Sequence, residues 1–398
     1  MKTESRYYRS GFGMRREIRG VVDEDYRSGL VDRAIEEQHR LVAGDLTIRL
    51  ARAFGFCYGV DRAVDYAYET RARFPDRRIF LTGEIIHNPK VNGRLRDLGV
   101  EILEGIGLAR FEPVGDGDVV LIPAFGCTRD ELTALRERGC VLVDTTCGSV
   151  LSVWKNVERY ARQGFTALVH GKHDHEETRA TCSQTEKYEN GRYVVVRNLE
   201  ETEMLCATIR GETDGETFLA HFAPHAVSPG FDPDRDLERI GCANQTTMLS
   251  SESLAIAERV RREMRDRWGD EALGERFVAF DTICSATQER QDAVRELIAE
   301  RPNVMIVVGG YNSSNTGHLA EISLEAGLTV FHVDRAECII DATRIRHLPV
   351  GASAEVEATD WLPDGPLLVG LTAGASTPNV EVGGVLERLV DLRAPREP

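Results

Sequence analysis

The sequence lacks any apolar stretch long enough to cross a membrane, and it lacks an export signal. A transmembrane helix needs about 18 or more apolar residues in a row, and no such run occurs among the 398 residues. The first twenty residues, MKTESRYYRSGFGMRREIRG, are basic and aromatic but contain no apolar signal-peptide core. We therefore expect a cytoplasmic protein without a membrane partner. The plastid stroma is the alternative for a chain of plant origin.

An excess of positive charge is also missing. The 65 acidic residues outnumber the 49 Lys and Arg residues, which gives a formal net charge of −16. Nucleic acids and anionic membranes attract basic surfaces, so we expect neither as a partner. The hydrophobic share of 42% and the charged share of 29% are those of a soluble globular protein. The length predicts two or three domains.

The nine cysteines include no CxxC pair. An odd number of cysteines without an export signal argues against a disulfide framework, and zinc ribbons and thioredoxin-type sites normally use CxxC. Three cysteines, Cys57, Cys147 and Cys284, each stand between an apolar run and a helical pattern. We interpret the other six as core residues. They are Cys127, Cys140, Cys182, Cys206, Cys242 and Cys338.

Apolar strand candidates alternate with amphipathic helices from about residue 46 onward, as in CVLVDTT (140–146) and NVMIVVGG (303–310). This alternation predicts an α/β fold with parallel sheets. The three similar cysteine segments indicate three α/β units. The larger distance from Cys147 to Cys284 than from Cys57 to Cys147 indicates that the middle unit is enlarged. The expected parts are a helical N-terminal extension (1–45), a first unit (46–138), a second unit (139–275) with an insertion near 183–239, and a third unit with the C-terminal segment (276–398).

Three thiols at helix starts would suit an iron–sulfur cluster if the three units face one another. Helix N-termini favour the thiolate form, and iron in such clusters prefers sulfur ligands. A cluster held by only three cysteines keeps one iron open to bind a substrate oxygen. Two alternatives stay open on the residues alone. One is zinc with three cysteines and a water, which could not supply electrons; the other is three unrelated buried cysteines.

Polar side chains follow several of the predicted strands. The segment HGKHDHEET places histidines beside glutamates, a combination that suits proton delivery or metal binding, although a solvated loop has the same composition. Hydroxyl and amide groups at strand ends can hold a phosphate at a helix N-terminus, whereas each of them alone can also be an ordinary N-cap. These polar groups occupy positions 87–88, 170–177, 245–247, 312–315 and 376.

Together these segments resemble one enzyme family. FCYGVDRA, EIIHNPKV, DTTC, HGKHDHEET, QTTM, DTICSATQERQDA, GGYNSSNT and TAGASTP occur in the order found in the 4-hydroxy-3-methylbut-2-enyl diphosphate reductases, the LytB family. The resemblance runs from about Leu46 to Leu389, and the N-terminal part is similar to the longer cyanobacterial and plastid-type branch. Enzymes of this family reduce their substrate to isopentenyl and dimethylallyl diphosphate, the last step of the methylerythritol phosphate route to isoprenoids.

The resemblance implies three α/β units around a pseudo-threefold axis, with a central 4Fe–4S cluster. Cys57, Cys147 and Cys284 would be its three ligands, and the open iron would take the substrate's hydroxyl oxygen. Glu177 would deliver protons, and Thr246 would lie beside the substrate hydroxyl. The implied substrate-binding residues are His87, His175, Gln245, Ser313, Ser314, Asn315 and Ser376.

Two positions depart from the family pattern. Phe125 stands where many bacterial relatives have histidine, a substitution that the cyanobacterial-type branch shares. Gly148 stands where the family usually has proline, which should loosen the helix start after Cys147.

The resemblance also implies an electron donor such as ferredoxin or flavodoxin. Because this chain is acidic, we expect its docking surface to be locally basic. Two other interpretations are an enzyme resembling quinolinate synthase, which would lack the SSN and QTT segments, and a non-catalytic iron–sulfur sensor or carrier. A carrier normally uses four protein ligands and needs no anion site.

Overall fold

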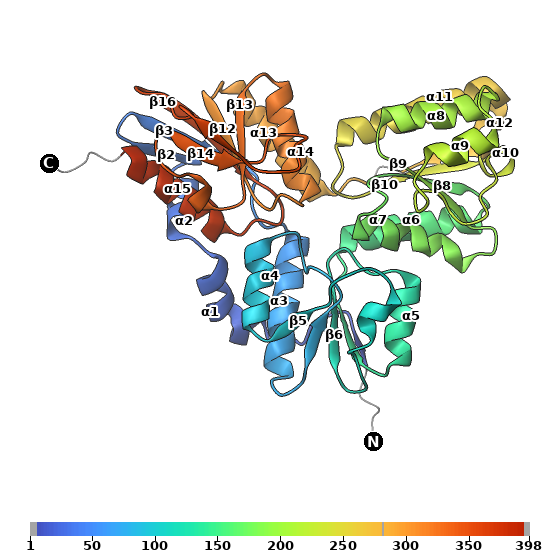
Figure 1. Cartoon of the computed structure of the whole chain (residues 1–398), viewed down its shortest axis with the longest axis horizontal. Coiled ribbons are helices and arrows are strands. Elements are labelled where there is room, and N and C mark those ends of the chain that lie inside the picture. Colours follow the sequence, from blue (N-terminus) through green and yellow to red (C-terminus); the bar gives the residue numbers. More distant parts are fainter. Residues whose placement is uncertain (1–5, 281, 394–398) are drawn as a thin grey trace. The chain divides into compact units, whose positions relative to one another are not determined.

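The structure, a computed structural model, describes residues 6–280 and 282–393. It contains three main sheets whose strands are mostly parallel, in agreement with the predicted α/β class (Figure 1). The chain forms two compact units. Among the described residues, unit 1 comprises 6–9, 77–83, 101–280 and 282–284, and unit 2 comprises 10–76, 84–100 and 285–393. None of the described helices is both long and apolar enough to span a bilayer.

The first sheet has the strand order β1-β7-β6-β4-β5. All residues of its central strands β6 and β7 are buried, which is expected for parallel strands covered on both faces. Helix α5 begins with a capping box in which Thr128 and Glu131 each bond the other's backbone N–H. The elements are β1 (Tyr7–Tyr8), β4 (Ile79–Leu81), β5 (Val100–Ile102), the 3-10 helix η1 (Leu108–Phe111), β6 (Val119–Ile122), α5 (Arg129–Glu137) and β7 (Val141–Asp144).

The second sheet, also in unit 1, has the order β11-β10-β8-β9, and all of its pairs are parallel. Helix α6 lies on one side of it, and α8 and α11, which contact each other, lie on the other side (Figure 1). The elements are α6 (Gly148–Arg162), β8 (Thr166–His170), α7 (Glu176–Cys182), η2 (Ser183–Lys187), β9 (Arg192–Val196), α8 (Leu199–Arg210), α9 (Gly215–His221), α10 (Pro233–Asp236), β10 (Ile240–Asn244), α11 (Ser250–Trp268), α12 (Asp270–Arg276) and β11 (Phe277–Ala279).

The third sheet, in unit 2, has the order β13-β12-β16-β3-β2, in which only β2 and β3 pair antiparallel. Side chains of a strand alternate between faces, so Ile306 of β12 packs in the core that α2 and α15 close, whereas its neighbour Met305 packs against Leu297 of α13. The elements are α1 (Arg15–Tyr26), α2 (Gly29–Glu36), β2 (Arg40–Ala43), β3 (Leu46–Leu50), α3 (Tyr58–Arg73), α4 (Pro89–Asp97), α13 (Ser285–Ala299), β12 (Val304–Val308), α14 (Ser314–Glu325), β13 (Thr329–Val333), η3 (Ala336–Cys338), the β14 (Arg344–His347) and β15 (Val356–Thr359) hairpin pair, β16 (Leu367–Ala373) and α15 (Asn379–Arg393).

Strand pairing differs in several places from the boundaries expected in the sequence. Strand β3 lies in the range 46–138 but pairs with β16 of the third sheet, and β7 lies in 139–275 but pairs with β6 of the first. Strand β9, inside the expected insertion 183–239, pairs with β8 of the second sheet. The extension 1–45 contains helices α1 and α2, as expected, and also β1 and β2. Linear order does not reveal which sheet a strand joins, because strands that are neighbours in a sheet can be far apart in the sequence.

Strand β10 has a weak sequence signal, IGCAN, because it contains a glycine and an asparagine, which are uncommon in strands. Its glycine explains the weakness, since a Cβ on Gly241 would lie 2.5–2.7 Å from ring atoms of Tyr160 in α6. The Tyr160 hydroxyl donates to the carbonyl of Cys242, 2.8 Å away. Close packing of a tyrosine against the strand therefore replaced the branched residues that usually mark a buried strand.

Candidate active site

Each of the three cysteines singled out in the sequence lies at the start of a helix. Cys57 and Cys147 are the N-cap residues of α3 and α6, and Cys284 directly precedes α13. All three are partly exposed, whereas the other six free cysteines are buried. The exposed N–H groups of a helix start favour a thiolate. The structure therefore separates three accessible thiols from six core thiols, as the sequence predicted.

Cys147 and Cys284 both lie at the N-terminus of α6 in unit 1. The Cys147 N–H donates to the carbonyl of Ala124 at 2.9 Å, which fixes the loop that precedes α6. The hydroxyl of Ser149, in the first turn of α6, donates to Cys284 Sγ at 3.3 Å. The start of α6 follows directly after Cys147 even though Gly148 replaces the proline expected there.

Glu177 and Thr246 form a buried pair in unit 1. Their exposed fractions are 1% and 5%. The Thr246 N–H donates to Glu177 Oε1 at 2.6 Å, and the Thr246 hydroxyl lies 2.9 Å from Glu177 Oε2. The carbonyl of Thr246 accepts the backbone N–H of Cys284 at 3.4 Å. Because a hydroxyl both donates and accepts, the contact between Oγ1 and Oε2 can pass a proton in either direction.

His175 is the N-cap residue of α7, in whose first turn Glu177 lies. Its Nδ1 accepts the backbone N–H of Glu177 at 3.1 Å, which leaves Nε2 as the protonated nitrogen of the neutral ring. The ring of Phe125 packs edge-on against the imidazole, with 5.4 Å between centroids and 83° between planes. The phenylalanine that departs from the common family pattern thus contacts a predicted site residue.

Gln245 and His170 are buried and bonded to neighbouring protein groups. Gln245 Oε1 accepts from the Thr178 hydroxyl at 3.1 Å, and its Nε2 donates to the Thr247 hydroxyl at 2.8 Å. His170 Nδ1 lies 2.7 Å from the Ser253 hydroxyl. These contacts fix the loops that carry Glu177 and Thr246.

A second group of predicted residues comes together in unit 2. Ser313 is the N-cap residue of α14. The Ser376 hydroxyl donates to the His87 carbonyl at 3.1 Å and lies 3.4 Å from Ser313 Oγ. The backbone N–H of Cys57 donates to the carbonyl of Ala375, the residue before Ser376, at 3.2 Å. Four segments far apart in the sequence therefore meet at the start of α14.

Three buried polar groups at the start of α14 have no hydrogen-bond partner among the residues that the structure describes. They are Ser314 Oγ, Asn315 Nδ2 and Thr316 Oγ1, whose residues are 6%, 2% and 0% exposed. A buried polar group without a partner typically costs roughly 1–3 kcal/mol. Since helix N-termini attract anions, these groups and the first turn of α14 can bind a phosphate group.

Glu84, which the sequence did not single out, contacts the predicted site residue His87. Its Oε2 accepts from His87 Nδ1 at 2.9 Å and from Asn312 Nδ2 at 2.7 Å. Burial raises the pKa of Glu84, but its interactions with His87, Asn312 and Arg96 together outweigh burial, so the net pKa is lowered. The available signal was the acidic residue three positions before His87 in GEIIHN.

Comparisons with known proteins agree over nearly the whole chain. The family model described as LytB protein matches residues 48–390. The chain is 48% identical to the 4-hydroxy-3-methylbut-2-enyl diphosphate reductase of Thermosynechococcus vestitus over 395 residues, which cover 99% of this chain and 96% of that protein.

Two solved structures are also similar. One is a structure of (E)-4-hydroxy-3-methyl-but-2-enyl diphosphate reductase, described as the terminal enzyme of the non-mevalonate pathway. It matches with a TM-score of 0.53 and 29% identity over 86% of this chain and 99% of that chain. The E-1-hydroxy-2-methyl-but-2-enyl-4-diphosphate reductase from Plasmodium falciparum matches with a TM-score of 0.61 over 88% of both chains, and at 19% identity it supports the fold alone. On the extent of these matches, the chain belongs to the LytB protein family.

Proposed function

We propose that this protein is an iron–sulfur oxidoreductase that reduces 4-hydroxy-3-methylbut-2-enyl diphosphate to isopentenyl and dimethylallyl diphosphate, the last step of the methylerythritol phosphate pathway. Two electrons and two protons are consumed, the allylic C–O bond breaks, and the hydroxyl leaves as water. Protonation of the allyl fragment at one end or the other gives the two products. The observation that carries the proposal is the buried Glu177–Thr246 pair beside Cys284, in a chain 48% identical to a reductase of this name.

The proposed cofactor is one 4Fe–4S cluster bound by Cys57, Cys147 and Cys284, with one open iron. The donor set fits, because all three thiols are partly exposed at helix starts and their chemistry is that of iron–sulfur ligands. The hydroxyl of Ser149 donates to Cys284 Sγ and so helps to fix the position of this sulfur. When bound, the cluster supplies the electrons and a Lewis acid that polarises the C–O bond.

Glu177 and Thr246 supply the proton for the departing oxygen. Hydroxide is a poor leaving group, so the oxygen needs a proton as its bond to carbon breaks. A proton on Glu177 Oε2 passes to Thr246 Oγ1, 2.9 Å away, while the threonine hydroxyl donates to the substrate. The Thr246 N–H on Oε1 holds the carboxyl group in this orientation throughout.

The diphosphate binds at the start of α14. Ser314 Oγ and Asn315 Nδ2 supply donors that have no hydrogen-bond partner in the described part of the chain, and the hydroxyls of Ser313 and Ser376 lie 3.4 Å apart in the same region. His87, held by Glu84, and His175, packed against Phe125, complete the proposed set. Gln245, whose Nε2 donates to the Thr247 hydroxyl beside Thr246, belongs to the same proposed substrate-binding set.

The proposed electron donor is a protein such as ferredoxin or flavodoxin. A cavity of about 490 Å³ in unit 1 supports docking of an acidic partner, because Thr146, next to Cys147, lines it and cations outnumber carboxylates around it. The charged residues of its lining are Arg9, Arg129, Arg136, Lys155 and Lys187, with Asp144 and Glu158.

The test is an anaerobic assay on protein whose iron and acid-labile sulfide have been measured. Reduced methyl viologen serves as the electron donor, and 4-hydroxy-3-methylbut-2-enyl diphosphate is added. We expect rapid viologen oxidation with isopentenyl and dimethylallyl diphosphates as products. Intact cluster without substrate-dependent oxidation would refute the proposed reaction, and zinc in place of iron and sulfide would refute the proposed cofactor.

A further inference from the structure

Arg290 is a buried cation that none of the steps above uses. It lies in α13, in the segment DTICSATQERQDA, and only 5% of it is exposed. Arginine stays charged at every pH at which proteins fold. Burying a charge is costly unless hydrogen bonds compensate it, so its contacts indicate what the residue stabilises.

The guanidinium group bonds to the loop that leads into Cys57. Nε and Nη2 donate to the Gly55 carbonyl at 3.2 and 2.6 Å, and Nη2 also lies 3.2 Å from the Phe56 carbonyl. Nη1 donates to the Ala286 carbonyl in the first turn of α13, at 2.8 Å. Arg290 therefore ties the two residues before Cys57 to a helix whose first residue follows Cys284.

The loop before Cys57 has no regular secondary structure, so it depends on such contacts. Gly55 has a φ of +70°, and a Cβ there would lie 3.0 Å from Asn379 Oδ1 and 3.3 Å from the Thr377 carbonyl. The backbone N–H of Gly55 donates to the carbonyl of Ala373, the last residue of β16, and the N–H of Cys57 donates to the carbonyl of Ala375, two residues further on. The loop's N–H groups therefore bond to the segment at the end of β16, and its carbonyl groups at Gly55 and Phe56 accept hydrogen bonds from Arg290.

An arginine suits this position better than any other side chain. Its planar fork presents several N–H donors at fixed angles, whereas lysine offers a point charge on a flexible stem. The positive charge of Arg290 also acts on α3, the helix whose N-cap residue is Cys57. Burial and the carboxylate of Asp65 raise the pKa of Asp61 in the first turn of α3, and Arg290 is among the cations that oppose this.

We propose that Arg290 is a positioning residue for the iron–sulfur cluster: its fork holds Cys57 in place, and its fixed charge favours the more negative, reduced state of the cluster. Positive charge in a buried, weakly screened environment stabilises nearby negative charge. Groups that orient a metal ligand typically change metal affinity when they are removed. The inference rests on the proposed cluster and on Cys57 as one of its ligands.

The experiment compares anaerobically purified holoenzyme of the wild type with Arg290→Gln and Arg290→Lys. Two readouts are the midpoint potential from an EPR-monitored redox titration and the rate at which a chelator removes iron. Arg290→Gln is expected to shift the potential to more negative values and to lose iron roughly tenfold faster. Arg290→Lys keeps the charge but loses the fork, so its potential should stay near that of the wild type while iron loss is faster.

Arg295→Gln is the matched control, because Arg295 is on the same helix but is exposed and pairs with Asp292. It should match the wild type in both readouts. A wild-type potential and iron-loss rate in Arg290→Gln would overturn the role of Arg290 while leaving the proposed function intact. A wild-type protein without an iron–sulfur cluster would overturn both the role of Arg290 and the proposed function. Faster iron loss in Arg290→Gln with an unchanged midpoint potential would overturn the electrostatic part of the proposal.

Discussion

Two buried polar clusters of this protein differ in how completely their hydrogen bonds are made. Around Glu177 in unit 1, both carboxylate oxygens contact Thr246, and Gln245 fixes the adjoining loop. At the start of α14 in unit 2, Ser314 Oγ and Asn315 Nδ2 have no partner among the described residues. One cluster is complete without a ligand, and the other is not.

The difference in hydrogen bonding is what proton transfer on the one hand and anion binding on the other would require. A group that transfers a proton works best when its geometry is fixed before the substrate arrives. A group that binds an anion gains most when its hydrogen bonds are made only by that anion, because unmade bonds in a buried site are costly. The complete cluster therefore suits proton transfer, and the incomplete cluster suits diphosphate binding.

The largest effect is expected for Glu177→Gln. Glutamine keeps the size of the side chain and can still accept the Thr246 N–H, but it cannot carry the proton. We expect kcat to fall by about 10²–10⁴-fold, with substrate binding retained in calorimetric titration. Asp174→Asn, an exposed change in the same segment, should retain full turnover. Substantial turnover by Glu177→Gln would contradict the proton-transfer role.

Cys284→Ser tests the proposed cluster through the thiol that Ser149 contacts. Serine oxygen is a poorer ligand for iron than a thiolate, so the variant should hold an incomplete or labile cluster. Iron and sulfide analysis of the anaerobically purified protein measures this directly. The buried Cys206→Ser is the control and should keep the full cluster. A full and stable complement of iron in Cys284→Ser would remove it from the ligand set.

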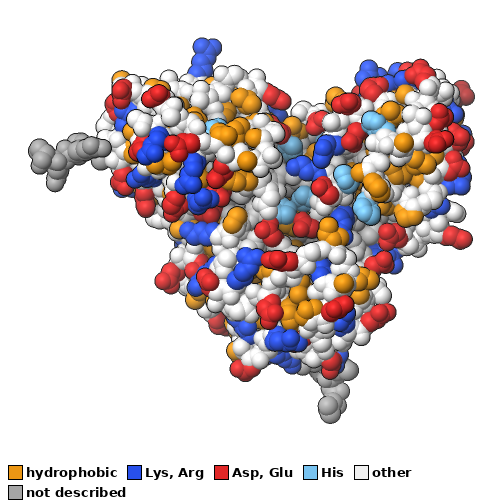
Figure 2. Space-filling view, in the orientation of Figure 1, with side chains coloured by type: hydrophobic (Ala, Val, Ile, Leu, Met, Phe, Trp, Pro, Cys, Tyr) orange, Lys and Arg blue, Asp and Glu red, His pale blue; other side chains and the backbone are white. Residues whose placement is uncertain are grey.

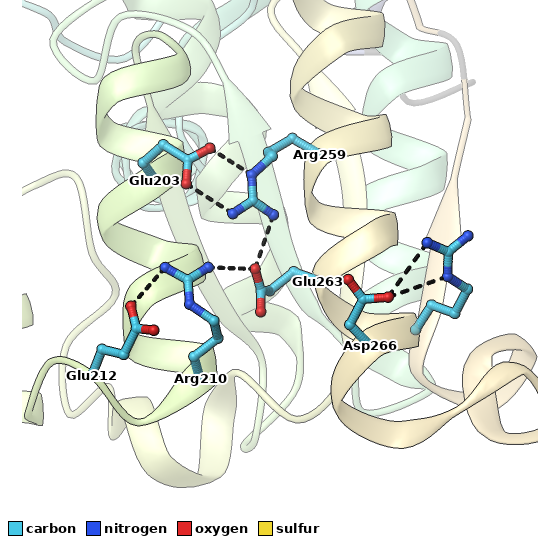
Figure 3. Close-up of polar contacts among 7 residues, drawn as sticks. Glu203, Arg210, Glu212, Arg259, Glu263 and Asp266 are labelled. Atoms are coloured by element: carbon cyan, nitrogen blue, oxygen red, sulfur yellow. Dashed lines mark hydrogen bonds and ion pairs between the residues drawn. The ribbon is translucent and has the colours of Figure 1, made fainter.

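A complete cluster without a catalytic task should affect stability alone, and the ion network between α8 and α11 is such a cluster. Glu263, with a side chain 5% exposed, accepts from Arg210 at 2.6 Å and from Arg259 at 2.9 Å (Figure 3). Glu263→Gln should lower the free energy of unfolding by about 2 kcal/mol, because two arginines lose a charged partner. Denaturant titration measures this.

The same network contains its own control. The side chain of Glu212 is 60% exposed and contacts only the outer part of the network, through Arg210. Glu212→Gln should lower the free energy of unfolding much less than Glu263→Gln does, because exposed ion pairs contribute little. Equal losses in the two variants would mean that burial does not decide the strength of these ion pairs.

The incomplete cluster is tested by Ser314→Ala. Removing an unbonded hydroxyl should leave the thermal midpoint unchanged or slightly higher, while KM for the substrate rises roughly tenfold, as for the loss of one hydrogen bond to a charged group. Ser323→Ala on the same helix is the opposite case, because its hydroxyl donates to the Leu319 carbonyl at 2.8 Å. It should lower stability and leave KM unchanged. A lower midpoint for Ser314→Ala would show that its hydroxyl is bonded within the protein.

The sequence predicted what local patterns encode. Strand–cysteine–helix junctions, the α/β class and the six core cysteines follow from apolar periodicity and turn chemistry, and the structure agrees with each. Motif similarity supplied the family, which the comparisons confirm. The roles of the individual site residues stay predictions.

What the sequence did not predict depends on contacts between distant segments. Gly241 reads as a strand breaker until Tyr160 is seen against it. Glu84 and Arg290 look like ordinary charged residues, because their partners at His87 and at the loop before Cys57 are set by tertiary packing. Strand β3 joins a sheet whose other parallel strands begin more than 250 residues later.

Charge distribution is likewise invisible in the net charge of −16, which conceals the basic cavity of unit 1. Lys and Arg side chains are interspersed with Asp and Glu over the face shown in Figure 2. Lys155, exposed on α6 and part of the cavity lining, gives the smallest of the expected effects. Lys155→Glu should raise KM for an acidic ferredoxin roughly three- to tenfold at low salt, because rim charges mainly change association rates.

High salt should remove that difference, since screening weakens attraction between exposed charges. The rate with methyl viologen, a small cationic donor that needs no protein docking surface, should stay at the wild-type value. Arg261→Glu, at an exposed cation that pairs with Glu258 on α11, makes the same change of charge away from the cavity. An equal rise in KM for Arg261→Glu would assign the effect to net charge, and a changed viologen rate for Lys155→Glu would place Lys155 in the reaction instead of the docking step.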